Sequence, residues 1–141
     1  MVDKIVIDTS VLINALIGKE GPGREILRRC LMGHYTPLIS NALFHEYEDV
    51  TMRKHIFDLC PLKPSEIRTL LNAFYNTCQW IPIYYLWRPN LKDEDDNFLI
   101  ELAIAGNSHY IITNDTKDLR NAELHFEEVK IVTPKEFLRG N

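Results

Sequence analysis

The chain has 141 residues, of which 45% are hydrophobic and 26% charged, and its formal net charge is −4 at neutral pH. That length suits a single domain spanning residues 1–141, and the composition excludes disordered, collagen-like and disulfide-scaffold proteins. The sequence shows neither an apolar run long enough for a membrane span nor a signal peptide, which predicts a cytoplasmic protein. Three widely spaced cysteines fit no disulfide framework or paired zinc motif, so we expect reduced thiols.

Short strands alternate with helices along the whole chain. Apolar and β-branched runs predict strands at 4–7, 36–39, 80–85, 109–113 and 129–132, the third placed at a sheet edge because it contains Pro82. Helical periodicity and capping residues predict helices at 11–17, 24–32, 41–54, 64–78 and 93–105, and a short one after Thr133. Because parallel strands need crossover connections, this alternation predicts an α/β fold with a parallel sheet between helices.

Two acids follow predicted strands. Asp8 comes after the first strand and Asp115 after the fourth. Open α/β sheets bind ligands outside the carboxyl ends of their strands, so these two carboxylates are candidates for one shared site. An aspartate at a strand end can equally be a helix cap or a turn residue. Each acid taken alone therefore leaves both interpretations open.

Two further acids lie on helix stripes that should face inward. Glu46 falls at helical spacing with Leu43, Tyr47 and Val50, and Asp96 with Leu99, Ile100 and Ala103. Each acid also has a purely structural interpretation. Glu46 could lie at the edge of the stripe with its carboxylate in water, and the acids of 93–96 could do no more than interact favourably with a helix dipole. Four converging carboxylates would repel one another without a cation, and their oxygen-only chemistry suits Mg²⁺ or Mn²⁺ better than zinc.

The same residues, in the same order, resemble the PIN-domain nucleases. The resemblance rests on Val6-Ile7-Asp8-Thr9-Ser10, Glu46, the stretch 93–99 and Ile112-Thr113-Asn114-Asp115, and it is closest to the toxin-like branch of toxin–antitoxin pairs. It implies a three-layer α/β/α sandwich around a parallel sheet of five strands. It also implies an endoribonuclease that uses Mg²⁺ or Mn²⁺, with an RNA substrate and an antitoxin protein as candidate partners.

Carried over residue by residue, the resemblance assigns catalytic and metal-binding roles to Asp8, Glu46, Asp96 and Asp115. The family's acidic stretch leaves Asp95 and Asp96 as alternatives, and the inward stripe favours Asp96. Asp118 is an outer candidate ligand, although the segment before it is one residue longer than in the nearest relatives. The polar residues expected to support the first acid or its metal-bound water are Thr9, Ser10 and Thr113.

The sequence gives weaker signals for the residues that contact substrate or partner. The cations that could contact RNA phosphates are Arg24, Arg28, Arg29, Arg88 and Lys92, and the alternative for each is a solvated helix face. The aromatic segment near Trp80 is a candidate surface for a homodimer.

Two other functions remain to be compared with the nuclease. One is a non-catalytic PIN-like module that binds RNA or protein. The other is a phosphoryl-transfer protein with Asp8 as nucleophile, which is disfavoured because Ser10 stands where such phosphatases carry a second aspartate.

Overall fold

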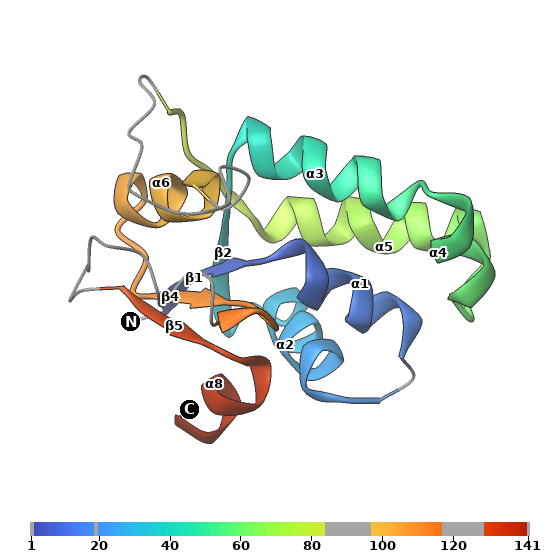
Figure 1. Ribbon diagram of the computed structural model, residues 1–141, viewed down its shortest axis with the longest axis horizontal. Helices are drawn as coiled ribbons and strands as arrows, with labels where there is room; N and C mark the ends of the chain where they lie inside the picture. Colours follow the sequence, from blue (N-terminus) through green and yellow to red (C-terminus); the bar gives the residue numbers. More distant parts are fainter. Residues whose placement is uncertain (1, 19, 84–96, 117–128, 141) are drawn as a thin grey trace.

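Five short strands form one parallel sheet in the computed structural model, which describes residues 2–18, 20–83, 97–116 and 129–140. The strands are β1 (Asp3–Ile7), β2 (Tyr35–Ile39), β3 (Gln79–Trp80), β4 (Tyr110–Ile112) and β5 (Lys130–Val132). Their order is β3-β2-β1-β4-β5, and every neighbouring pair is parallel (Figure 1). The predicted α/β class and the five-stranded parallel sheet are confirmed.

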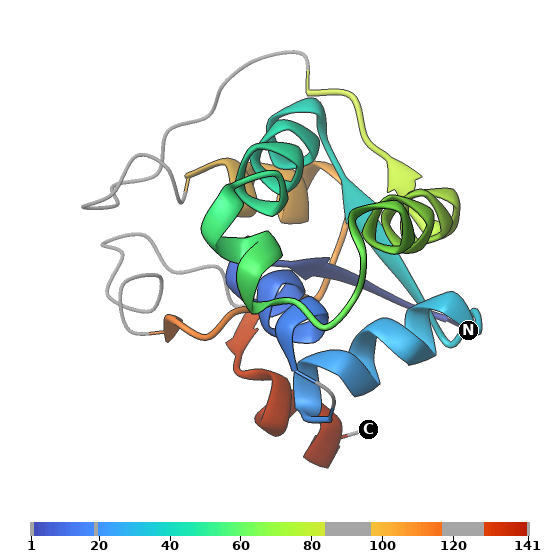
Figure 2. The same ribbon diagram turned by 90° about the vertical axis from the view of Figure 1, so that its right-hand side faces the viewer.

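Helices lie on both faces of this sheet. They are α1 (Thr9–Ile17), α2 (Pro22–Leu31), α3 (Asn41–Thr51), α4 (Lys54–Leu59), α5 (Pro64–Thr77), α6 (Asn97–Ala105) and α8 (Pro134–Gly140). Helix α6 packs on β1, β2 and β4 from one side, while α2 and α8 contact each other on the opposite side (Figures 1 and 2). The arrangement is the expected three-layer sandwich.

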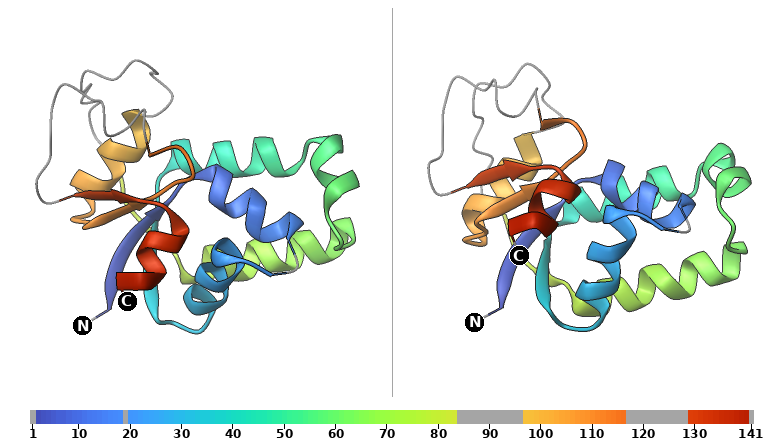
Figure 3. Two further views of the ribbon diagram at one scale, coloured as in Figure 1. Left: turned by 60° about the horizontal axis from the view of Figure 1, so that its bottom comes forward. Right: turned by 90° about the horizontal axis from the view of Figure 1, so that it is seen from below.

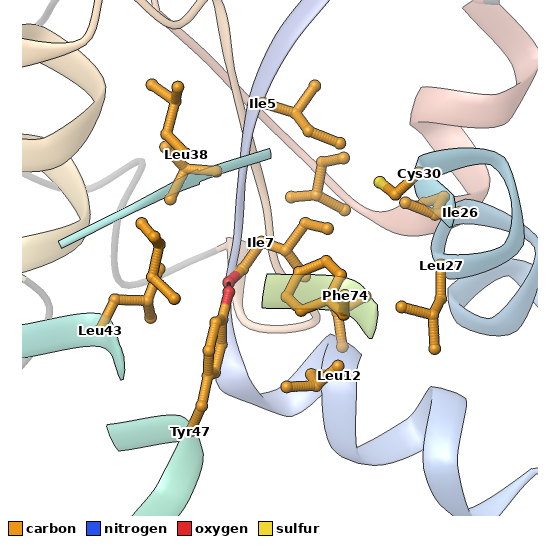
Figure 4. Close-up of a cluster of buried hydrophobic side chains, with 14 of the residues drawn as sticks. Ile5, Ile7, Leu12, Ile26, Leu27, Cys30, Leu38, Leu43, Tyr47 and Phe74 are labelled. Atoms are coloured by element: carbon orange, nitrogen blue, oxygen red, sulfur yellow. Dashed lines mark hydrogen bonds between the residues drawn. The ribbon is translucent and has the colours of Figure 1, made fainter. Parts of the chain in front are cut away.

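The core follows from the sequence of the central strand. Ile5, Val6 and Ile7 of β1 are all buried, as a strand covered on both faces requires. Figure 4 shows Ile7 at the meeting point of side chains from α1, α3 and α5, among them Leu12, Tyr47 and Phe74. The carboxyl end of β1 is therefore packed firmly, and the residue that follows it is held in a defined place.

Helices α3 and α5 run side by side, with α4 joining them at the end away from the sheet (Figures 1 and 3). Arg68 of α5 donates hydrogen bonds of 3.0 and 2.9 Å to the carboxylate of Glu48 in α3. Tyr75 of α5 donates a third, of 2.6 Å, to the same carboxylate. Burial raises the pKa of Glu48, but these hydrogen bonds outweigh it, so the net pKa is lowered and the group stays ionised.

The position of α3 relative to β1 is fixed by Tyr47. Its hydroxyl donates a hydrogen bond to the backbone oxygen of Ile7, the last residue of β1 (Figure 4). Burial raises the pKa of this hydroxyl well above its usual value, and the neighbouring Cys78 thiol and Asp8 carboxylate raise it further. Tyr47 therefore stays a donor, and the helix that carries Glu46 is tied to the strand that precedes Asp8.

Local capping signals are confirmed at two helices. The Ser40 hydroxyl accepts a hydrogen bond of 3.2 Å from the backbone N–H of Leu43 at the start of α3. Before α8, the Thr133 hydroxyl accepts from the Glu136 N–H, and the Glu136 carboxylate accepts from the Thr133 N–H. Such caps depend on neighbours in the chain, which is why the sequence alone predicts them.

Two expected elements differ in the structure. The helix predicted for 41–54 ends at Thr51, and a separate α4 begins at Lys54. The edge strand predicted for 80–85 is Gln79–Trp80, with residues 84–85 outside the described chain; it does lie at the sheet edge. Helix α6 ends at Ala105 as predicted, and Asn107 just beyond it adopts the left-handed conformation. Gly106 is needed for space, because a Cβ there would stand 2.4 Å from Leu38 Cδ1.

No helix within the described residues is long and apolar enough to cross a membrane.

Candidate active site

The candidate site lies at the carboxyl ends of β1, the central strand of the sheet, and of its neighbour β4. The chain builds β1, β2 and β3 outward in one direction and then returns to place β4 on the other side of β1. Such a reversal is where open α/β sheets bind ligands. The β1–β4 ladder continues past the strands, since the Asp8 N–H donates 2.9 Å to the oxygen of Ile112. Asp8 and Thr113 consequently lie beside each other.

Asp8 occupies the N-cap position of α1, yet its side chain caps nothing. Its Oδ2 instead accepts hydrogen bonds from the Thr113 hydroxyl at 2.6 Å and the Ser10 hydroxyl at 3.2 Å. This answers the alternative that Asp8 is an ordinary helix cap. Both donors hold one carboxylate oxygen, so the carboxylate is oriented by side chains while the α1 N-terminus favours its negative charge.

Thr113 links the two strand-end acids. It is fully buried, and its hydroxyl oxygen accepts a hydrogen bond of 3.1 Å from the backbone N–H of Asp115 while donating to Asp8. The Ser10 hydroxyl similarly accepts from the Asn114 N–H at 3.5 Å. Two hydroxyls thus join the start of α1 to the turn after β4. The exposed Asp115 is held next to the half-buried Asp8 by its own backbone.

Glu46 lies on α3, the helix that follows the carboxyl end of β2. It is half-buried, whereas Leu43 and Tyr47 on the same stripe are fully buried, so the predicted inward stripe is correct and Glu46 lies at its edge. Within the described residues, no three acids, histidines or cysteines form a group that could hold a metal ion. Asp95, Asp96 and Asp118 lie outside the described residues.

The other predicted site residues differ in whether their polar groups already have partners in the described chain. Thr9 is buried, and its hydroxyl has no hydrogen-bond partner among the described residues, so Ser10 is the hydroxyl that holds Asp8. Arg28 and Arg29 both pair with Glu25, at 2.7 and 3.1 Å, which fixes them along α2. Those hydrogen bonds from the two arginines lower the pKa of Glu25 to about 2 despite some desolvation. Arg88 and Lys92 lie outside the described residues.

Arg24 has a different role in α2. Its Nη1 donates to the backbone oxygens of Gly18 at 2.7 Å and Ala15 at 3.4 Å, which lie in the last turn of α1 and just beyond it. It makes no ion pair with an acid of the described chain. Its guanidinium group therefore lies at the end of α1 without an acidic partner among the described residues.

Glu101 is a buried acid that sequence reasoning missed. It lies in α6, is 6% exposed, and belongs to a helix that packs on both β1 and β4. The available signal was an acid inside the apolar run 98–104. Helical periodicity would place Glu101 on an outer face of the helix. However, α6 is buried on nearly every side, since Leu99, Ile100, Leu102 and Ala103 are all buried.

Comparison with known proteins decides the family. The PIN domain model matches residues 4–117, which include the strand ends, α3 and α6 described above. The chain belongs to the PIN domain family. A curated relative of this PIN domain, an uncharacterised protein of Methanocaldococcus jannaschii, is 30% identical over 96% of this chain and 89% of its own length.

A solved structure shows the same fold. The crystal structure of VapBC2 from Rickettsia felis, bound to a DNA fragment from their promoter, contains a chain that matches with a TM-score of 0.61 at 15% identity. The match covers 91% of this PIN domain and 96% of that chain. PIN domains are generally nucleases that use divalent metal ions.

The donor types of the described acids match that chemistry, although these acids alone form no complete group of metal ligands. Asp8, Asp115 and Glu46 offer only oxygen ligands, which is the donor set that Mg²⁺ and Mn²⁺ prefer. Asp8 also has the outer hydrogen bonds that orient a ligating carboxylate, from Thr113 and Ser10.

Proposed function

We propose that this PIN domain is an endoribonuclease that hydrolyses RNA phosphodiester bonds with the aid of Mg²⁺ or Mn²⁺. The observation that supports it best is the Asp8 carboxylate, which stands at the switch point of the sheet and is held by two hydroxyls instead of capping its helix. A carboxylate that served only as a cap would accept from the backbone of α1.

Asp8, Glu46, Asp96 and Asp115 would hold the metal, with Asp118 as an outer ligand. When bound, a divalent ion at such a site lowers the pKa of water and neutralises charge on the phosphate. Thr113 contributes by donating to Asp8 Oδ2, which leaves Oδ1 without a partner among the described residues. Ser10 fixes the same oxygen from the first turn of α1. No covalent bond between enzyme and RNA is required.

The first test compares wild type with Asp8→Asn. We expect slow cleavage of a labelled single-stranded RNA with Mn²⁺ or Mg²⁺, none in EDTA, and none by the variant, because an amide cannot supply the anionic ligand. Asp58→Asn, an exposed acid in α4, is the matched control and should cleave like wild type. Circular dichroism should show that both variants fold.

Two outcomes would favour the other functions. RNA binding without cleavage in either metal would indicate a non-catalytic module. Labelling of Asp8 by acetyl phosphate, with no RNA cleavage, would indicate phosphoryl transfer.

We also propose that the protein is the toxin of a toxin–antitoxin pair, because its structural neighbour belongs to a VapBC2 complex. Coexpression with the product of an adjacent small gene should yield a complex that cleaves RNA more slowly than the isolated PIN domain. A neighbouring product that neither binds nor inhibits would contradict the toxin role.

We further propose that the protein forms a homodimer through the edge of its sheet. Trp80 of the edge strand β3 is 46% exposed and stacks near Phe44 at a ring distance of 5.3 Å. Exposed apolar edges tend to pair with another chain. Light scattering should give a dimer at micromolar concentration, and Trp80→Lys should shift it toward monomer; a wild type that scatters as monomer would contradict this surface.

A further inference from the structure

A cavity of about 320 Å³ lies beside the candidate active site, between α1, the start of α2 and the first turn of α8. Its volume is in the range of pockets that bind small molecules. The polar side chains that line it are Asn14, Arg24, Asn114 and Lys135, and Glu20 is the acid on its wall. Among these residues the cations outnumber the acid, whereas the neighbouring active site is acidic.

The pocket and the candidate active site are built from the same two segments, α1 and the turn after β4. Asn14 follows Ser10 by four residues on α1, so the two side chains lie on one face of the helix. Asn114 directly follows Thr113, and its backbone N–H donates to the Ser10 hydroxyl. Val11, which also lines the pocket, donates its N–H to the backbone oxygen of Asp8 at 3.0 Å. A ligand chain leaving the acids along α1 would therefore enter this pocket.

The cations of the pocket are free to meet an anion. Four other arginines of the described chain are paired with acids: Arg28 and Arg29 with Glu25, Arg53 with Asp49, and Arg68 with Glu48. Arg24 uses only Nη1, on backbone oxygens, and so keeps donors on Nε and Nη2. Lys135 is exposed and makes no ion pair within the described residues.

The two asparagines supply the complementary groups for a base. Both side chains are exposed and make no hydrogen bond that ties them to the described chain. Asn is a poor helix former, yet Asn14 stands in α1 between the apolar residues Ile13 and Ala15. A carboxamide offers two donors and an acceptor, the pattern that reads the edge of an unstacked nucleobase.

The wall of the pocket is built tightly. A Cβ at Gly23 would stand 3.1 Å from the backbone oxygen of Val11, so glycine lets α2 approach α1 closely. That approach brings Arg24 over the end of α1, where the two backbone oxygens hold it. The close contact between α1 and α2 therefore fixes one wall of the pocket.

We propose that this pocket binds the nucleotide next to the cleaved phosphate in a single-stranded RNA. Arg24 and Lys135 take its phosphate, and Asn14 and Asn114 hydrogen-bond to its base, which gives cleavage a sequence preference. This inference rests on the proposed ribonuclease function and adds a substrate subsite to it.

The binding test uses the whole protein in EDTA and follows side-chain amide signals by nuclear magnetic resonance. Each of the four nucleoside 5′-monophosphates, and inorganic phosphate alone, serves as a probe at millimolar concentration. We expect at least one nucleotide to shift the Asn14 and Asn114 amide signals saturably, and phosphate alone to shift them less. Equal shifts with phosphate, or none with any nucleotide, would overturn the proposal.

The kinetic test compares Asn14→Ala and Lys135→Ala with wild type on a randomised single-stranded RNA. Loss of one hydrogen bond or one phosphate contact should raise KM about fivefold, with kcat changed less than about twofold. Asn14→Ala should also change the distribution of cut sites. Asn72→Ala, an exposed asparagine of α5, and Lys54→Ala at the start of α4 are the matched controls.

Failure of the substrate subsite and failure of the ribonuclease function give different experimental results. If wild type cleaves but both variants keep its KM and cut sites, the pocket is not a substrate subsite and the ribonuclease function stands. If wild type cleaves no RNA with either metal, the proposed function fails, and the substrate subsite fails with it.

Discussion

The hydroxyl of Thr113 is the smallest feature on which the candidate site depends. It donates to Asp8 and accepts from the Asp115 N–H, so one buried oxygen positions both strand-end acids. The sequence indicates Thr113 through the family resemblance, which includes the stretch Ile112-Thr113-Asn114-Asp115. It could not show that Thr113 and Ser10, distant in sequence, converge on one carboxylate oxygen.

Thr113→Val tests this positioning role. Valine has nearly the same shape but neither donates nor accepts, so Asp8 loses one donor and the Asp115 N–H loses its acceptor. We expect RNA cleavage to fall about 10- to 100-fold, the usual cost of losing an outer partner of a metal ligand. Higher Mn²⁺ concentration should restore part of the activity. Assays over a Mn²⁺ series would measure both effects.

Thr51→Val is the matched control for that variant. Thr51 is also fully buried, but its hydroxyl donates to the backbone oxygen of Tyr47 within α3. Its loss should lower stability by about 1 kcal/mol and leave the Mn²⁺ dependence unchanged. Equal loss of activity in the two variants would mean that Thr113 acts only through stability.

At the scale of elements, the helix pair α3–α5 decides where Glu46 stands. The Glu48 carboxylate, which accepts hydrogen bonds from Arg68 and Tyr75, fastens the two helices two residues after Glu46. Helix starts with caps were predictable, as Ser40 and Thr133 show. The break between α3 and α4 was not, because neither glycine nor proline marks it and α4 is held by contacts with α1 and α3.

Glu48→Gln should destabilise the protein in a pH-dependent way. Because the folded-state pKa is lowered from the usual 4.5, the charged group stabilises the fold above that pH, and the contribution is lost as pH falls through the folded-state pKa. The variant should therefore be less stable at pH 7 by about 1 kcal/mol, with partial exposure limiting the effect. Urea unfolding at pH 7 and below pH 4 would show the difference shrinking.

Asp49→Asn provides the comparison on the same helix. Its pair with Arg53 is 2.7 Å long, but both side chains are more than half exposed. Stability should change by less than about 0.5 kcal/mol. A Glu48→Gln effect that persisted unchanged in acid would show that lost packing, not lost charge, explains it.

At the scale of the whole molecule, the topology sets β1 and β4 side by side, so that Asp8 and Asp115 follow neighbouring strands. Strand ends and inward stripes were readable from the sequence, and so was the parallel sheet. The strand order β3-β2-β1-β4-β5 was not, because it depends on long-range pairing, and it alone puts Asp8 and Asp115 at the switch point. Burial of Glu101 was not predictable for a related reason. Helix α6 is covered on nearly all sides, and that burial depends on where the helix lies in the fold.

The overall stability should respond to the charge of this acid site. Two carboxylates about 4 Å apart repel by a few kcal/mol at an effective dielectric constant of about 20, before screening and proton uptake. If Asp96 converges with Asp8, Glu46 and Asp115, neutralising it relieves that repulsion in the metal-free protein. Asp96→Asn should therefore raise Tm in EDTA. It should also reduce the Tm increase caused by millimolar Mn²⁺, because metal stabilises only by binding the folded state.

Melting curves of wild type and Asp96→Asn, each in EDTA and in Mn²⁺, separate this expectation from a capping role. A cap at the start of α6 would interact favourably with the helix dipole, so its loss would lower Tm and leave the Mn²⁺ shift intact. Asp58→Asn, an exposed acid in α4, should change neither value appreciably. A destabilised Asp96→Asn with an undiminished Mn²⁺ shift would place Asp96 outside the metal site.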